Sequence, residues 1–261
     1  MTNLTDKIGF SALLEENGRL SFGAAVDVEK VSERKFSDLR PVAANQDVPL
    51  SDNSSYLMYR GVKKMADAEK ISNSNLRFDL TVVPPAKIGD EYIKTIGHYH
   101  PNKQGTNFQY PELYYVASGV ATCLVQNLEN GIVTDVIICQ VEEGNSIVIP
   151  PGYGHATINA GNRTLVMANW VCNGFDSDYS EFENKQGAAY YILDKFGEKK
   201  IVKNPRYGEL LPVKNLKSAP KIIGPYLDNP AYDYVTDLSR VDFLRNPEKY
   251  LSDLSVANLF E

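Results

Sequence analysis

The sequence predicts an all-β fold built from short strands. From Phe78 onward, short apolar and β-branched runs alternate with turns rich in glycine, proline and asparagine. The sixteen tyrosines of the chain also favour strands. Strands at this close spacing are typical of a barrel or a sandwich, because parallel sheets need a long crossover between consecutive strands.

The expected strands follow one another along most of this region. FDLTVV leads through the turn PPAKIGD to EYIKTIGHYH, and two further strands meet near Gly119. Later strands are expected over Ile132–Val141, Ser146–Ile149, His155–Ile158 and Leu165–Val171, and AAYYIL and KKIVKNPRY can close or edge the barrel.

We divide the chain into three parts around this barrel. Residues 1–74 form an N-terminal arm packed on the barrel, residues 75–207 form the barrel, and residues 208–261 form a C-terminal extension. In the arm, apolar residues with charges between them predict a short amphipathic helix over Val62–Ile71. In the extension, a helix is expected over Asp237–Leu254 with an interruption at Pro247.

Composition and charge argue against several classes of binding partner and cellular location. The net charge of −6 and the pI near 5.2 argue against a nucleic-acid binder, which needs a basic surface. Cys123, Cys139 and Cys172 lie within apolar runs without CxxC spacing, so we expect reduced thiols and a cytoplasmic protein. The N-terminus lacks the pattern of a signal peptide and no long apolar run occurs, so neither secretion nor membrane insertion is expected.

All three histidines of the chain lie between Thr95 and Asn159. On a strand, alternate side chains point to the same face, so His98 and His100 project together and two imidazoles can share one ion. Glu112 follows in PELYYVASG, which reads as another strand.

Two strings around these histidines resemble the conserved motifs of the cupin superfamily. GNSIVIPPGYGHATIN matches the second motif at five positions, and the first motif is matched at four, with a longer segment than usual between His100 and Glu112. A loop absorbs such an insertion at little cost. The matched residues are Gly144, Pro150, Gly152, His155 and Asn159 in the second motif, and His98, His100, Glu112 and Gly119 in the first. The resemblance implies a cupin double-stranded β-helix, a jelly-roll barrel of two sheets.

The resemblance also implies a metal centre formed by His98, His100, Glu112 and His155. Three neutral imidazoles and one carboxylate suit one divalent transition metal, namely Fe²⁺, Zn²⁺, Mn²⁺, Ni²⁺ or Co²⁺. Calcium and magnesium are disfavoured because they prefer shells made only of oxygen.

Among cupins, the chain is similar to the cupin-type phosphoglucose isomerases. The run LTVVPPAKIGDEYIKTIGHYH carries this resemblance, together with ELYYVASG, CLVQ, PPGYGHATINAG, DSDY and KNPRY. It implies interconversion of glucose 6-phosphate and fructose 6-phosphate, as in glycolysis and gluconeogenesis, and it covers residues 75–207. Cupin barrels often pair, so we expect a homodimer.

The same resemblance implies roles for residues around the substrate. Thr81, Thr95 and the backbone of Gly97 are expected to bind the phosphate, since hydroxyl and N–H groups are suitable donors to its oxygens. The chain departs from the family at Val171, where a tyrosine can reach the phosphate, and at Ser177, where a histidine can precede the Asp-Tyr pair.

Several further aromatic and polar residues also match. Tyr99, Tyr114, Gln126 and Tyr153 can each line the pocket or fill the barrel, and core packing is the more common role for Tyr99 and Tyr114. Tyr99 is nevertheless retained as a second catalytic candidate.

Isomerisation moves a proton and a carbonyl between C1 and C2, so a divalent ion would stabilise an enediolate and Glu112 would carry the proton. Glu112 can instead be mainly a ligand, with bound water or a tyrosine as the base, or the hydrogen can move as hydride. Two other classes fit the same ligands, a cupin dioxygenase and a non-catalytic sugar-binding cupin.

Overall fold

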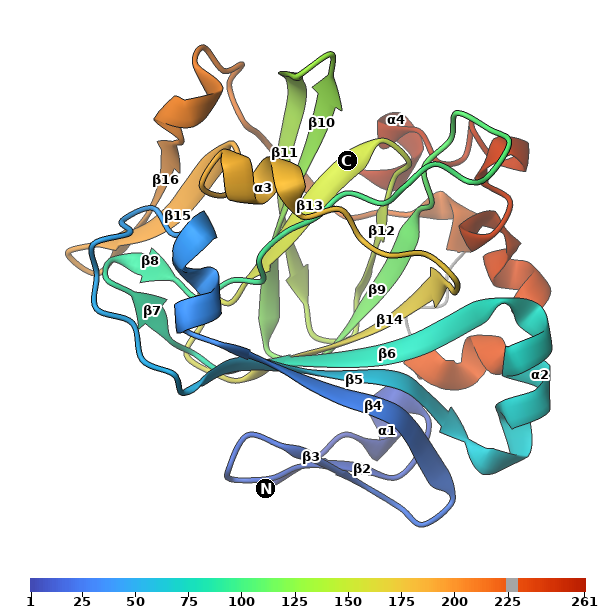
Figure 1. Cartoon of the computed structure of the whole chain (residues 1–261). Coiled ribbons are helices and arrows are strands. Elements are labelled where there is room, and N and C mark those ends of the chain that lie inside the picture. Colours follow the sequence, from blue (N-terminus) through green and yellow to red (C-terminus); the bar gives the residue numbers. More distant parts are fainter. Residues whose placement is uncertain (224–229) are drawn as a thin grey trace.

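Two sheets face each other and enclose the interior of the barrel (Figure 1). The computed structural model describes residues 1–223 and 230–261. The larger sheet has the order β12-β9-β14-β6-β5-β4, and the facing sheet has the order β13-β10-β11-β17. The strands of the larger sheet are β4 (Val26–Lys35), β5 (Ser54–Lys64), β6 (Leu76–Val83), β9 (Glu112–Ser118), β12 (Ser146–Ile149) and β14 (Leu165–Cys172). The facing sheet contains β10 (Val120–Glu129), β11 (Ile132–Glu142), β13 (Tyr153–Ile158) and β17 (Lys214–Lys217).

Smaller elements surround these two sheets. One minor sheet contains β1 (Thr2–Asn3), β2 (Ala12–Leu14) and β3 (Leu20–Phe22), and the other contains β7 (Lys87–Ile88), β8 (Glu91–Tyr92), β15 (Tyr190–Lys195) and β16 (Glu198–Lys203). The α-helices are α1 (Thr5–Ile8), α2 (Ala68–Ser74), α3 (Ser180–Asn184) and α4 (Val256–Leu259). Short 3₁₀ helices span Ser37–Val42, Met65–Asp67, Pro205–Tyr207, Lys221–Ile223, Ala231–Thr236, Leu238–Leu244 and Pro247–Lys249. The all-β prediction is therefore confirmed, and the architecture is the two-sheet barrel that the cupin resemblance implied.

The N-terminal residues contribute directly to the larger sheet. β4 pairs with β5, and β5 pairs with β6 through Met58 opposite Thr81. In this way part of the segment that we assigned to an arm extends the sheet that forms one wall of the barrel. The division of the chain at residues 74 and 207 stays a prediction.

An aromatic cluster closes the outer face of the larger sheet. Phe78 and Trp170 project from neighbouring strands and pack against Tyr232 of the C-terminal extension, with the Phe78 and Tyr232 ring centroids 5.2 Å apart. The Trp170 indole N–H donates to the carbonyl of Ala231 at 2.8 Å. Because the extension covers the outer face, the inner face of the same strands is left to form the site.

Three local predictions need correction. The helix expected from Val62 begins at Ala68, because Val62 is fully buried in β5 and pairs with Val28. The C-terminal helix is a series of 3₁₀ turns, and Pro247 begins a separate turn. EYIKTIGHYH forms a regular strand only at its start, as β8.

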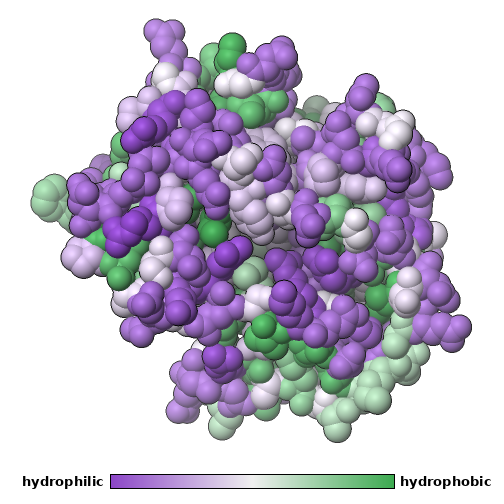
Figure 2. Space-filling model, viewed as in Figure 1, coloured by the Kyte–Doolittle hydropathy of each residue, from purple (hydrophilic) through white to green (hydrophobic). Residues whose placement is uncertain are grey.

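The surface in the view of Figure 2 is mostly hydrophilic. In the described part of the chain, no helix has the length and apolar character required to span a membrane.

Candidate active site and metal centre

The four predicted metal ligands meet at one point inside the barrel. One donor atom from each lies within 4.8 Å of the donor atoms of the others. His100 Nε2 and His155 Nε2 lie 3.3 Å and 3.2 Å from the same oxygen, Glu112 Oε2. His98 Nε2 lies 3.1 Å from His100 Nε2. Bonds of about 2.1 Å to a shared ion place neighbouring donor atoms about 3 Å apart, so this cluster can hold a metal ion.

The four ligands lie on different segments of the chain. Glu112 begins β9 and His155 lies on β13, which belongs to the facing sheet. His98 lies on an extended segment that pairs with β13: its N–H donates to the carbonyl of His155 at 3.1 Å, and the His155 N–H donates back at 3.0 Å. The two backbone bonds fix His98 beside His155, so the missing regular strand does not disturb the predicted HxH geometry.

Neighbouring polar groups orient the ligands toward the ion position. His100 Nδ1 lies 2.8 Å from the carbonyl of Tyr110, which fixes the hydrogen on Nδ1 and leaves the Nε2 lone pair free. Asn169 Nδ2 donates to Glu112 Oε1 at 2.7 Å. Glu112 Oε2 is buried and has no hydrogen-bond partner among the described residues. A buried carboxylate oxygen without a donor is costly, and a bound cation would satisfy it.

The electrostatics keep the ligands in the states that bind metals. Burial, followed by the proximity of the other imidazoles, holds the pKa of His98 well below its usual value, and burial also lowers the pKa of His155. Burial alone would raise the pKa of Glu112, but its close interactions with the His100 and His155 side chains hold it well below its usual value. Neutral imidazoles and an ionised carboxylate are the forms that coordinate a divalent ion.

A cavity opens beside the four ligands, and we call it the central cavity. The predicted phosphate residues Thr81, Thr95 and Gly97 all line it. The Thr95 hydroxyl oxygen accepts the N–H of Thr157 at 3.0 Å, and its own hydrogen remains available as a donor. Gly97 has φ +84°, and an added Cβ would lie 2.5 Å from the Phe182 ring, so this position requires glycine.

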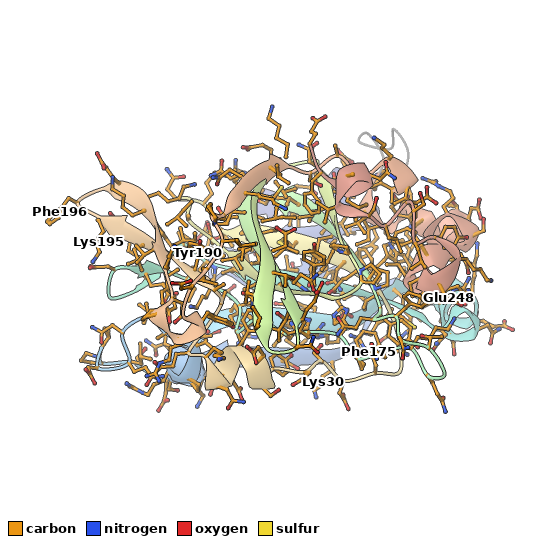
Figure 3. The ribbon with its side chains drawn as sticks, turned by 90° about the horizontal axis from the view of Figure 1, so that it is seen from above. Lys30, Phe175, Tyr190, Lys195, Phe196 and Glu248 are labelled. Carbon is orange, nitrogen blue, oxygen red and sulfur yellow. The ribbon has the colours of Figure 1, made fainter. Side chains whose placement is uncertain are left out.

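The two residues that depart from the family pattern also face the central cavity. Val171 and Ser177 both line it. A second hollow adjoins the cavity and shares Ser177 and Phe175 with it, while Lys30 lines only the second hollow. Figure 3 shows Lys30 and Phe175 on the same side of the molecule. The Phe175 ring also packs against the imidazole of His100, with centroids 4.8 Å apart.

The tyrosines divide between the cavity and the core. Tyr99 does not line the central cavity: its hydroxyl accepts a hydrogen bond from Gln126 Nε2 at 3.1 Å, and its ring packs on Phe182. Alternation along the chain turns Tyr99 away from its two histidine neighbours, so we do not carry its catalytic assignment further. Tyr114 does line the cavity, and its hydroxyl lies 3.2 Å from His155 Nε2. Tyr114 also packs against the hydrophobic core, so it combines the two roles that the sequence left open.

Sequence reasoning missed four polar residues at the site. Arg60, Arg77 and Asn169 line the central cavity, and Asp79 is buried between the two arginines. One signal was available, because Arg77, Asp79 and Thr81 alternate on one face of a predicted strand. The pairing of Asp79 with Arg60 depends on the register between two strands, so it could not be predicted from the local sequence.

Comparisons with known proteins agree with this geometry. A family model described as Glucose-6-phosphate isomerase (GPI) matches residues 33–207, about two thirds of the chain. The chain is similar to the glucose-6-phosphate isomerase of Thermococcus gammatolerans, with 28% identity over 197 residues that cover 71% of this chain and 96% of that protein. For the enzyme of the same name from Pyrococcus furiosus, identity is 27% over 195 residues, with coverage of 71% and 96%.

Among solved structures, oxalate decarboxylase from Bacillus subtilis matches with a TM-score of 0.33 and 19% identity, covering 47% of this chain and 28% of that chain. This chain thus spans little more than a quarter of that protein. The match to the isomerase family model covers more than half of this chain and includes all four residues of the ligand cluster. The chain belongs to the glucose-6-phosphate isomerase (GPI) family, as its resemblance to the cupin-type enzymes indicated.

Proposed function

We propose that this protein interconverts glucose 6-phosphate and fructose 6-phosphate at the four-ligand centre. The observation that carries this proposal is the cluster of His98, His100, Glu112 and His155, which lines a cavity also lined by hydroxyl and guanidinium groups. The family to which the chain belongs supports an isomerase over a dioxygenase or a non-catalytic sugar binder.

The three histidines and Glu112 would hold one divalent transition metal, namely Fe²⁺, Zn²⁺, Mn²⁺, Ni²⁺ or Co²⁺. The donor set fits such an ion, because one carboxylate oxygen is unpaired and the His100 tautomer is fixed. When bound, the ion would supply Lewis-acid stabilisation of the negative charge that develops on the two sugar oxygens.

Glu112 and Tyr114 are the residues placed to handle protons. The low pKa of Glu112, which results from His100 and His155 acting against burial, keeps the carboxylate ionised, and only the ionised form can act as a base. Burial and then the charge of Glu112 raise the pKa of Tyr114 well above its usual value, so its hydroxyl stays protonated and donates hydrogen bonds. We assign Glu112 as the proton carrier and Tyr114 as a donor to the substrate oxygens.

The neutral phosphate donors would be Thr81, Thr95 and the N–H of Gly97. All three line the same cavity as the ligands, so one hexose phosphate can contact both groups. The Thr81 side chain makes no hydrogen bond among the described residues, which leaves its hydroxyl free for a ligand. The substrate oxygens at C1 and C2 would then face the ion position and Tyr114.

We further propose a homodimer that acts in the cytoplasm in glycolysis and gluconeogenesis. The isomerase family supports this metabolic role. Three reduced buried cysteines support a reducing compartment.

A coupled assay tests the proposal. Purified protein loaded in turn with each of the five metals is given fructose 6-phosphate, and glucose 6-phosphate is measured with a dehydrogenase. We expect turnover with at least one metal and none after Glu112→Gln. Absence of glucose 6-phosphate with every metal would refute the proposed activity.

A further inference from the structure

Two guanidinium groups share one buried carboxylate on the inner face of β5 and β6. Arg60 Nη1 lies 2.7 Å from Asp79 Oδ2, and Arg77 Nε lies 2.9 Å from Asp79 Oδ1. Asp79 is 0% exposed and also accepts the N–H of Gly61 at 2.8 Å. The carboxylate therefore fixes both arginines, and its position is itself fixed by the backbone.

Apart from the ligand carboxylate of Glu112, this arrangement places two guanidinium groups and a single carboxylate at the wall of the central cavity. Arg60 and Arg77 are the only arginine or lysine residues among the described residues that line the cavity. Their side chains are only 32% and 25% exposed, and Asp79 is the only acidic side chain within ion-pair distance of either one in the described part of the chain. Two partly buried cations with one counter-ion favour a further anion, because partly buried charge without a partner is costly.

Donor groups remain on both guanidiniums. Arg60 uses Nη1 for Asp79 and Nη2 for Met58 Sδ at 3.3 Å. Arg77 uses Nε for Asp79 and Nη1 for the Asn173 side chain at 3.2 Å. A guanidinium carries more N–H donors than these contacts use, and its planar fork matches the oxygens of a phosphate.

The strand register places these donors next to the expected phosphate residues. Met58 lies opposite Thr81, so Arg60 is a diagonal neighbour of Thr81, at a Cα separation of about 7–8 Å that a long side chain can bridge. Arg77 lies directly opposite Val171, the position near which the family can place a tyrosine toward the phosphate. The guanidiniums can thus supply charge to a phosphate that also contacts the threonine hydroxyls.

We propose that Arg60 and Arg77 form an arginine pair that binds the phosphate dianion of the substrate and determines selectivity for phosphorylated sugars. Asp79 acts as the positioning residue that aims both guanidiniums at the cavity. The inference rests on the proposed function only where it states that the bound phosphate belongs to a hexose phosphate. Binding of a free phosphate ion at the pair needs no isomerase activity.

The test measures binding of inorganic phosphate to the full-length metal-loaded protein by titration calorimetry, alongside the KM for fructose 6-phosphate. The variants are Arg60→Gln, Arg77→Gln and Arg60→Lys, which keeps a charge beside Asp79 without the planar fork. Arg163→Gln is the matched control, because Arg163 pairs with Glu143 on the surface away from the cavity. Asp79→Asn tests the positioning role.

We expect each glutamine variant to weaken phosphate binding and raise KM by about 10- to 100-fold, the usual scale for hydrogen bonds to a charged group. Arg60→Lys should bind phosphate more tightly than Arg60→Gln but more weakly than the parent. Asp79→Asn should raise KM with little change in kcat. Metal content should match the parent in every variant.

Phosphate binding equal to the parent in both glutamine variants would overturn the arginine pair, as would no phosphate binding in the parent. If Arg60→Gln unfolds, Arg60→Lys and Arg77→Gln still decide the question. Phosphate binding that depends on the pair, in a protein without isomerase activity, would uphold this inference and reject the proposed function.

Discussion

Asn169 Nδ2 donates a 2.7 Å hydrogen bond to Glu112 Oε1, and this bond turns the other carboxylate oxygen, Oε2, toward His100 and His155. Both residues are buried, and β14 places Asn169 beside Tyr114 of β9. The amide therefore sets the orientation of the carboxylate before any ion binds.

Replacing Asn169 with alanine should weaken metal binding by about 10- to 100-fold, because the carboxylate loses the donor that orients it. Metal affinity is measured by competition with a chromogenic chelator. Asn127→Ala is the control, since the Asn127 side chain donates to Glu129 at 3.4 Å and does not line the central cavity. An affinity equal to the parent in Asn169→Ala would show that the hydrogen bond does not orient the ligand.

The metal-free protein should lose stability as the pH falls below 6.5. Burial lowers the pKa of His98 and His155 from the ordinary value of 6.5, so the unfolded chain binds more protons in this range. Each histidine then destabilises the folded state by up to about 1.4 kcal/mol per pH unit until its own folded pKa is reached. The pKa of Glu112 is lowered from 4.5, so protonation of Glu112 reduces the stability of the folded state only at pH values below 4.5.

Urea unfolding of the chelated protein at a series of pH values between 7 and 5 measures this slope. His98→Gln removes one of the titrating groups and should give a shallower dependence. An identical slope in the variant and the parent would show that His98 is not held neutral in the folded state.

Thr81→Val should raise the KM for fructose 6-phosphate by about 5- to 150-fold, corresponding to about 1 to 3 kcal/mol for a hydrogen bond to a charged group. Valine keeps the shape and removes the hydroxyl, and Thr81 is preferable to Thr95, whose oxygen also accepts the Thr157 N–H. Thr81→Ser keeps the donor and should remain close to the parent. Equal KM values for Thr81→Val and the parent would remove Thr81 from the phosphate site.

Tyr232→Ala should lower the free energy of unfolding by about 3–5 kcal/mol, the usual cost of deleting a buried aromatic ring. Tyr232 is 0% exposed and packs edge-on against Phe10, with centroids 5.0 Å apart. Phe196→Ala is the control, because Phe196 projects fully exposed from the turn after β15 (Figure 3). Phe196→Ala should change the free energy of unfolding, measured with urea, by no more than about 0.5 kcal/mol.

The strands and the HxH pair were predictable from local patterns, whereas the barrel type and the full ligand cluster were predicted from the resemblance to the cupin motifs. Alternation along β6, β11 and β14 and the turns between them are visible in the sequence, and the HxH spacing places two imidazoles on one side. The boundary of α2 was misplaced because Val62 and its neighbours pack inside a sheet, where tertiary burial overrides helical periodicity.

The arginine pair and the role of Tyr114 were not predictable in this way. Charged residues in a strand usually face solvent, and only the register of β5 on β6 places Arg60 against Asp79 inside the barrel. Alternation in GHYH turns Tyr99 away from the two histidines, but nothing in the sequence around Tyr114 indicates that it faces them. In the structure, Tyr114 pairs with Asn169 of β14 and its hydroxyl lies beside His155, whereas the hydroxyl of Tyr99 contacts Gln126 in the core.

If the four-ligand centre performs the isomerisation, activity must follow metal content. Chelated protein is titrated with the preferred metal while glucose 6-phosphate formation is followed, and His155→Ala is treated in parallel. We predict no activity without metal, a linear rise that ends at about one ion per chain, and loss of most bound metal and activity in His155→Ala. Full activity in protein shown to be metal-free would show that isomerisation does not need the ion, and stoichiometric metal in His155→Ala would show that His155 is not a ligand.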